Sequence, residues 1–117
     1  MEFTEMSRGD TVELDGHATL AGLDYNLVGK TLWFTGKTSK GLADTTATWQ
    51  RTIGNGITLV DSAKGKYRLK LEPGNTAGLP ALKTLIYWDV QAKDANGNVY
   101  TLKSGQVIVK PDITVST

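Results

Sequence analysis

Very few side chains in this 117-residue chain have the chemistry of an enzyme active site. His17 is the only histidine, and the chain has no cysteine. General acid–base and nucleophilic catalysis require a positioned base beside an oriented nucleophile, and no motif such as G-x-S-x-G places a serine near His17. His17 follows Gly16 at the edge of a short predicted strand, where an exposed histidine is the ordinary outcome. We therefore expect no catalytic residues and no enzymatic activity.

The acidic residues do not have the spacing of a metal site. A Ca²⁺ ion needs about six to eight oxygen ligands that converge on one point, and the chain has neither EF-hand nor nonapeptide spacing. Aspartate is favoured in turns because its carboxylate can bind nearby backbone amides. The glycine-rich segments also lack the lysine and helix of a phosphate loop. We expect no metal and no cofactor, and interpret these residues as loop and turn formers: Asp10, Asp15, Asp24, Asp61, Asp94 and Asn96.

The aromatic side chains offer a better candidate site than the polar ones. In a strand predicted at Thr84–Lys93, the alternation of side chains puts Leu85 and Tyr87 on the face opposite the core. In a strand predicted at Lys30–Thr38, Trp33 faces outward if its two neighbours face inward. The outer face of a sheet that contacts solvent should be polar. These three side chains would instead form an apolar patch on it, and such a patch marks a protein contact or a ligand groove. The candidate assembly interface is Trp33, Leu85 and Tyr87.

Two alternatives for this patch stay open. The loop Ser39–Thr46 or the N-terminal strand could cover it within the same chain, or the exposed rings could stack on a carbohydrate. The other two tryptophans, Trp49 and Trp88, are predicted to be core residues.

Strand patterns recur every 8 to 12 residues, the spacing of a sandwich or barrel. We predict an all-β fold, an immunoglobulin-like antiparallel β-sandwich of about 7–9 strands with a short 3₁₀ or helical turn at 74–80. Residues 1–117 should form one domain, with segments 1–7 and 111–117 mobile or exchanged between subunits. Arg8-Gly9-Asp10 is interpreted as a kink, and a bulge is expected at Ser104-Gly105. The predicted strands are Phe3–Met6, Thr11–Leu14, His17–Ala21, Lys30–Thr38, Ala47–Thr52, Ile57–Val60, Lys66–Glu72, Thr84–Lys93 and Asn98–Lys110.

Charge and composition exclude several classes of partner. The charged residues nearly cancel to a net charge of +1, so the chain lacks the field that attracts nucleic acid or anionic membranes. Its start lacks the basic and apolar regions of a signal peptide, and no apolar run approaches the length of a membrane helix. We expect no nucleic-acid and no membrane partner.

The order of the turn and strand motifs over about residues 8–110 resembles a family of tailed-bacteriophage structural domains. The motifs start at Arg8-Gly9-Asp10-Thr11 and continue through the apolar strand at 29–34 and a G-I-T hairpin at 56–73. An aromatic strand at 87–91, the turn at 94–101 and Ser104-Gly105 complete the order. The order is similar to that of the N-terminal domain of baseplate upper proteins.

The resemblance implies a non-enzymatic virion structural protein, in the tail, baseplate or neck. Such a protein would be made in the host bacterial cytoplasm and would work through protein–protein assembly contacts. Its expected partners are copies of itself and other phage tail or head proteins. The alternative function is a small carbohydrate-binding module for host surface glycan.

Overall fold

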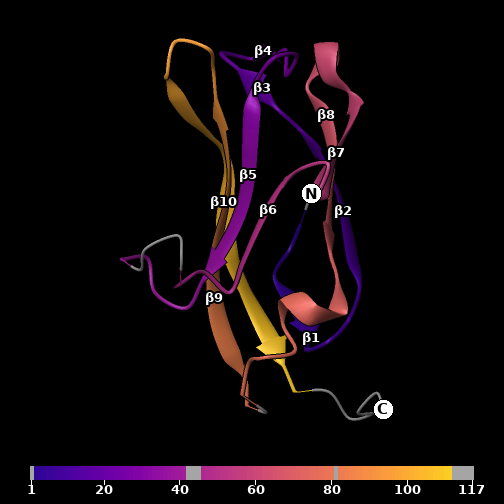
Figure 1. Cartoon of the computed structure of the whole chain (residues 1–117), viewed down its shortest axis with the longest axis vertical. Helices are drawn as coiled ribbons and strands as arrows, with labels where there is room; N and C mark the ends of the chain where they lie inside the picture. Colours follow the sequence, from indigo (N-terminus) through magenta and orange to yellow (C-terminus); the bar gives the residue numbers. More distant parts are fainter. Residues whose placement is uncertain (1, 42–45, 81, 112–117) are drawn as a thin grey trace.

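The computed structural model describes residues 2–41, 46–80 and 82–111, which form two β-sheet layers packed face to face (Figure 1). One layer has five strands, in the order β1 (Glu5–Ser7), β10 (Val99–Lys110), β9 (Thr84–Lys93), β5 (Thr31–Lys37) and β6 (Trp49–Ile53). The other has three, in the order β7 (Gly56–Asp61), β8 (Lys66–Leu71) and β2 (Val12–His17). The remaining elements are a hairpin of β3 (Thr19–Leu20) and β4 (Leu23–Asp24), and the 3₁₀ turns η2 (Ser62–Lys64) and η3 (Pro73–Asn75).

The chain passes from one layer to the other at the end of β6, which crosses toward β7 in Figure 1. Thr52 pairs with Gly56 and Ile53 with Ile57 in parallel register, on either side of a tight turn. Gly54 takes a φ of 83° in this turn, a conformation that L side chains rarely adopt. The two layers are therefore joined by hydrogen bonds at this corner and form one strongly bent sheet.

The predicted fold class, an all-β sandwich, is confirmed. In the layers, β8 lies between β7 and β2, and β9 lies between β5 and β10, which is how immunoglobulin-like sandwiches order strands D-E-B and C-F-G. The described residues hold ten strands rather than 7–9, because β3 and β4 form a small separate hairpin. Two pairings, β1 with β10 and β6 with β7, are parallel, where an antiparallel sandwich was predicted.

The predicted kink at Arg8-Gly9-Asp10 is a change of layer. Before it, β1 pairs with β10; after it, β2 pairs with β8. Gly9 has a φ of 80°, and the Asp10 amide donates to the Ser7 carbonyl across the turn. The first strand is thus held against the last strand of the chain.

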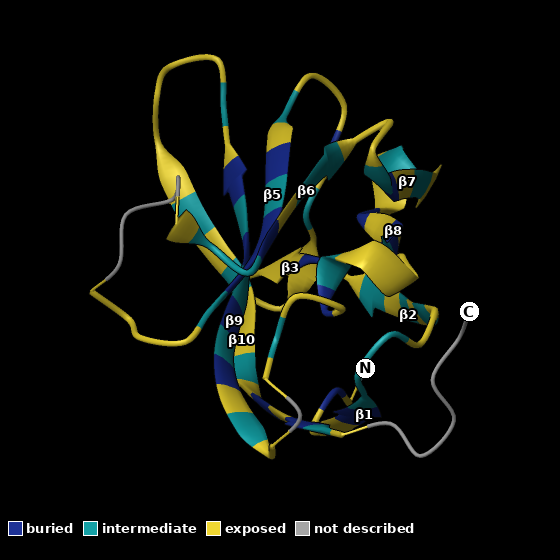
Figure 2. Ribbon diagram, turned by 60° about the horizontal axis from the view of Figure 1, so that its bottom comes forward, coloured by how far each residue is buried: buried dark blue, intermediate teal, exposed yellow. Residues whose placement is uncertain are grey.

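Aromatic side chains fill the centre of the core, which consists of the buried residues coloured dark blue in Figure 2. The ring of Phe3 lies within 6.2 Å of those of Phe34, Trp49 and Trp88, measured between centroids. The predictions that Trp49 and Trp88 are core residues are confirmed. Leu20 lies outside this core, because the chain turns away into the β3–β4 hairpin and leaves Leu20 49% exposed.

Three glycines inside strands each make room for a large ring. A Cβ atom at Gly16 would lie 2.2 Å from the Tyr67 ring, and one at Gly36 would lie 2.4 Å from the Trp49 ring. A Cβ at Gly105 would lie 2.9 Å from Trp88. Glycine in a strand interior often marks such a close approach.

Two local predictions are wrong in detail. The bulge lies between Thr101 and Lys103, not at Ser104-Gly105, because Gly105 is needed beside Trp88 and pairs regularly. The side chain of Asp61 makes no capping hydrogen bond to η2. Gly65, which follows η2, has a positive φ of 75°.

The predicted helical turn at 74–80 is the shorter 3₁₀ turn Pro73–Asn75. Proline occupies its first position, and Glu72 and Asn75 form a reciprocal capping box around it. These contacts satisfy backbone amides at the start of the turn.

Candidate functional site

The outer face of the five-stranded layer, the side that points away from the core, carries the candidate residues. Ile86, Trp88 and Val90 of β9 are buried, so the residues that alternate with them point outward. Strand register arranges the outward side chains in rows across the sheet. From one end to the other these rows contain Leu85–Ile108, Lys37–Tyr87–Gln106, Gln50–Thr35–Asp89–Ser104 and Trp33–Gln91–Thr101.

The three predicted residues lie on this face but do not form one apolar patch. Trp33 and Tyr87 are half-buried, and Leu85 is 40% exposed. One row of strand pairing lies between the row of Trp33 and the row of Tyr87, and this row, which contains Thr35 and Asp89, is polar. Period-two alternation placed the aromatic side chains correctly, but it could not show which neighbours come between them.

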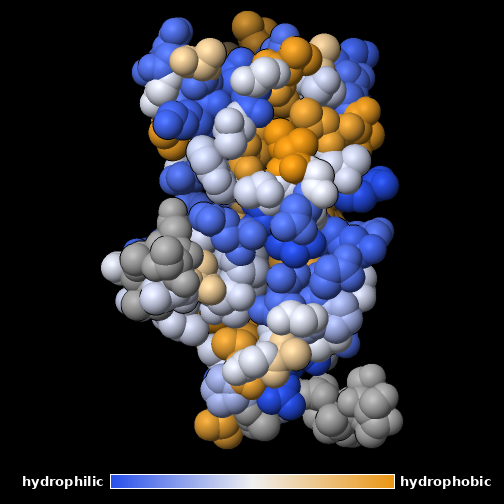
Figure 3. Space-filling model, viewed as in Figure 1, coloured by the Kyte–Doolittle hydropathy of each residue, from blue (hydrophilic) through white to orange (hydrophobic). Residues whose placement is uncertain are grey.

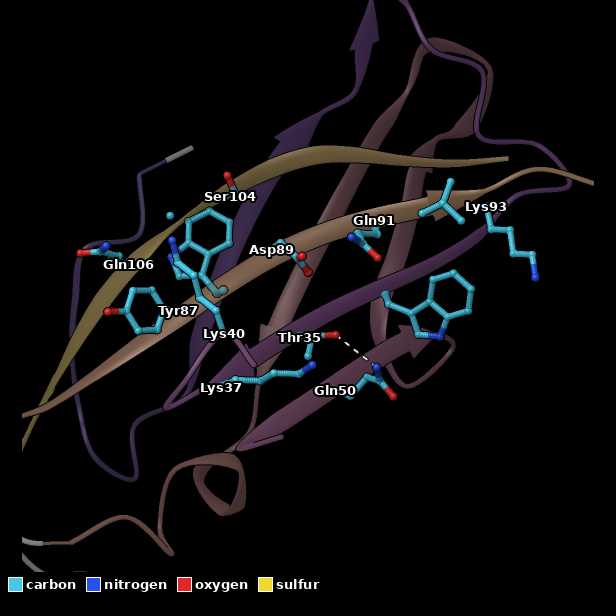
Figure 4. A pocket seen from close by; sticks show the side chains of 14 residues that line it. Thr35, Lys37, Lys40, Gln50, Tyr87, Asp89, Gln91, Lys93, Ser104 and Gln106 are labelled. Atoms are coloured by element: carbon cyan, nitrogen blue, oxygen red, sulfur yellow. Dashed lines mark hydrogen bonds between the residues drawn. The ribbon is translucent and has the colours of Figure 1, made fainter. Parts of the chain in front are cut away.

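A hollow of about 750 Å³ lies on the outer face, with Trp33 and Tyr87 both in its lining (Figure 4). We call it the outer-face hollow. Figure 4 shows Tyr87 and Gln106 near one end and Lys93 at the other, with Asp89 and Gln91 between. Its lining consists of Trp33, Thr35, Lys37, Lys40, Gln50, Tyr87, Trp88, Asp89, Gln91, Lys93, Val99, Ser104, Gly105 and Gln106.

Hydrogen bonds hold part of the hollow's polar lining in place. The Gln50 side-chain amide donates to the Thr35 hydroxyl over 3.2 Å, from β6 to β5 (Figure 4). The Gln91 amide donates to the Thr101 hydroxyl over 3.4 Å, from β9 to β10. These contacts run between neighbouring strands, so the rigid sheet positions the donors and acceptors.

The lining carries more positive than negative charge. Among the described residues of the lining, Lys37, Lys40 and Lys93 contribute three ammonium groups, and Asp89 contributes the one carboxylate. The Lys40 Nζ lies 5.1 Å from the centroid of the Tyr87 ring, a cation–π contact. The hollow therefore favours an anionic ligand over a cationic one.

The alternative that the patch is covered within the chain is answered in part. Lys40, from the predicted loop Ser39–Thr46, lies over Tyr87, while residues 42–45 of that loop lie outside the described residues. The N-terminal strand does not cover the face, because Phe3 and Met6 are buried in the core and β1 pairs with the edge of β10.

Leu85 lies outside the hollow and pairs with another exposed aliphatic residue. It is directly opposite Ile108 of β10, which is 38% exposed. We call these two residues the Leu85–Ile108 pair. The sequence analysis missed Ile108, because the bulge in β10 shifts the alternation of the strand and only the register with β9 places Ile108 beside Leu85.

His17 and the predicted turn-forming residues lie away from the hollow's lining. The Nε2 atom of His17 lies 2.8 Å from Oδ1 of Asp24, in an exposed pair at the end of β2. Asp94 accepts hydrogen bonds from the amides of Asn98 and Asn96, which hold the pKa of its carboxyl below the usual range. Within the described residues, no group of three or more His, Cys, Asp or Glu side chains could hold a metal ion.

Within the described residues, no helix is both long enough and apolar enough to cross a membrane.

Comparisons with known proteins add no family assignment. No family model matches the chain, and no curated protein matches it significantly.

Proposed function

We propose that this chain is a non-enzymatic structural protein of a bacteriophage particle, which assembles through contacts with copies of itself. The order of motifs shared with the tailed-phage structural domains supports the phage assignment. The sandwich supports it at the level of the fold alone, because folds of this class carry many functions. The protein would be made in the host cytoplasm and would act in the virion, in its tail, baseplate or neck.

The proposed contact surface is centred on the Leu85–Ile108 pair. Two aliphatic side chains stand directly opposite each other on the solvent face of adjacent strands, each with about two-fifths of its area exposed. Tyr87, the next outward-facing residue after Leu85 on β9, is half-buried. Adjacent exposed aliphatic and aromatic residues are the usual composition of the centre of a protein interface.

Light scattering tests the contact surface. The wild-type protein should have a mass of at least two times 12.6 kDa. The mass of the double variant Leu85→Asp/Ile108→Asp should shift toward that of the monomer, because burying an unpaired carboxylate at an interface is costly. Val99→Asp is the matched control, since Val99 is 53% exposed at the other end of β10. A wild-type monomer at high concentration, or equal effects of both changes, would rule out this surface.

Particle composition tests the phage assignment separately. Purified phage particles from a strain that carries this sequence should contain the chain in fixed proportion to the other virion proteins, as measured by mass spectrometry. Detection of the chain only in the cell fraction would remove the phage assignment and leave the contact surface unaffected.

A further inference from the structure

The outer-face hollow alternates aromatic and polar side chains along one direction. Trp33 and Tyr87 lie in rows on either side of a polar row that contains Thr35 and Asp89. Trp33 pairs with Gln91, four residues from Tyr87 along β9, so the two rings stand about 13 Å apart along the strand at about 3.3 Å per residue. A ligand that fills the hollow must be elongated and must present apolar and hydrogen-bonding surfaces in turn.

A chain of sugar rings has this alternation. Each ring presents an apolar C–H face that can pack on an indole or phenol ring, and its rim carries hydroxyl groups that donate and accept hydrogen bonds. The polar row offers both kinds of partner, with a carboxylate at Asp89, an amide at Gln50 and hydroxyls at Thr35 and Ser104. The Lys40 ammonium lies over the Tyr87 ring, so a sugar ring that packs on this face of Tyr87 must displace the Lys40 side chain.

A protein partner fits the hollow less well. The buried centre of a protein interface is depleted of lysine and aspartate, yet four lining residues are of these types: Lys37, Lys40, Asp89 and Lys93. An added peptide strand would pair with a sheet edge, whereas β9 and β5 have neighbours on both sides. The Leu85–Ile108 pair, the proposed protein contact, lies outside the lining.

The three lysines and one aspartate of the lining specify the charge of the ligand. We propose that the outer-face hollow binds an oligosaccharide that carries carboxylate groups. Its rings pack on Trp33 and Tyr87, its hydroxyls bind the polar row, and its carboxylates lie near the lysines. This site is separate from the assembly contact, so a virion component with this site would also hold an acidic glycan.

Calorimetric titration with a galacturonate tetrasaccharide tests the site. Trp33→Ala and Tyr87→Ala should each weaken binding by about tenfold, since each removes a stacking surface. Tyr100→Ala is the matched control, because Tyr100 is a half-buried tyrosine that does not line the hollow, and it should bind as the wild type does. Gln50→Ala probes the polar row without changing either ring, and circular dichroism verifies that each variant is folded.

The charge requirement is tested with a neutral glucose tetrasaccharide and with Lys93→Gln. The wild type should bind the neutral sugar more weakly than the galacturonate, and Lys93→Gln should weaken galacturonate binding about threefold, with a smaller effect in high salt. Equal binding of both sugars, or binding of neither, overturns the proposal.

The assembly variant separates this proposal from the proposed function. Leu85→Asp/Ile108→Asp should keep the sugar affinity of the wild type even where it loses self-association. If Trp33→Ala changes the oligomeric mass and no sugar binds, the hollow is a protein contact and the proposal is wrong.

Discussion

Burial alone controls the ionisation of Tyr67, whose ring lies against Gly16 in the core. Loss of hydration raises the pKa of its hydroxyl from 10.0 to about 12. Because the folded pKa is above the unfolded one, this contribution to stability is complete below pH 10 and is lost as the pH rises through about 12. The alternation of β8 turns Tyr67 inward, and the pairing of β2 with β8 brings Gly16 beside it.

Tyr67→Phe should remove this part of the alkaline sensitivity. Between pH 10 and 12 the wild type should lose up to about 2 kcal/mol more of its free energy of unfolding than the variant. Urea denaturation at a series of pH values measures this difference. Tyr100→Phe, at a half-buried position, should follow the wild-type curve, and parallel curves for wild type and Tyr67→Phe would contradict the assignment.

At the scale of the strands, glycines determine where the large rings can pack. Gly36 of β5 is paired with Trp49 of β6, and the indole occupies the space that a Cβ would need. Gly36→Ala should therefore destabilise the fold by about 1–3 kcal/mol, the usual cost of an overpacked core. Guanidinium denaturation followed by fluorescence measures it.

A double-mutant cycle checks the cause. Trp49→Phe replaces the indole with a smaller ring. It removes no hydrogen bond within the described chain, because the indole N–H is buried without an acceptor there. The variant with both changes should lose less stability than the two single losses combined. Gly41→Ala is the control, since nothing lies within 4 Å of a Cβ at that position. If the two single losses of stability are fully additive in the double variant, the Trp49 ring is not what excludes a larger residue at position 36.

Strand patterns predicted the elements better than the details within them. Thr84–Lys93 is the observed β9, because its alternation and β-branched residues agree over its whole length. The bulge in β10 was predicted at Gly105 because glycine permits a bulge. The glycine is needed there for a different reason, which is that the Trp88 ring of β9 lies against it. Such a contact depends on which strands are neighbours, and the sequence does not state that.

For the whole molecule, the N-terminal segment is part of the core. Phe3 is buried among three aromatic rings, and its carbonyl accepts a hydrogen bond from the Trp88 indole N–H over 3.1 Å. Phe3→Ala should cost about 3–5 kcal/mol, as for other buried phenylalanines. Chemical denaturation measures the loss, and Val28→Ala, at a position 58% exposed, is the control. A loss below about 1 kcal/mol would mean that the segment is dispensable.

Residues 2–7 include β1 and two core side chains, Phe3 and Met6. The expectation that segment 1–7 is mobile or exchanged between subunits stays a prediction. Residues 112–117 of the predicted C-terminal tail lie outside the described residues. The sequence could not predict the hollow either, because its lining comes from four strands and a loop whose order in the sheet is not their order in the chain.

The parallel pairing of the first strand with the last has a mechanical consequence. Glu5, Met6 and Ser7 lie opposite Ile108, Val109 and Lys110 in that order, so the chain enters β1 and leaves β10 at opposite ends of their shared ladder. A pulling force on the two ends would load these evenly spaced hydrogen bonds in shear, all at once, rather than peel them one by one. The junction between the first and last strands is thus built to resist tension along the chain.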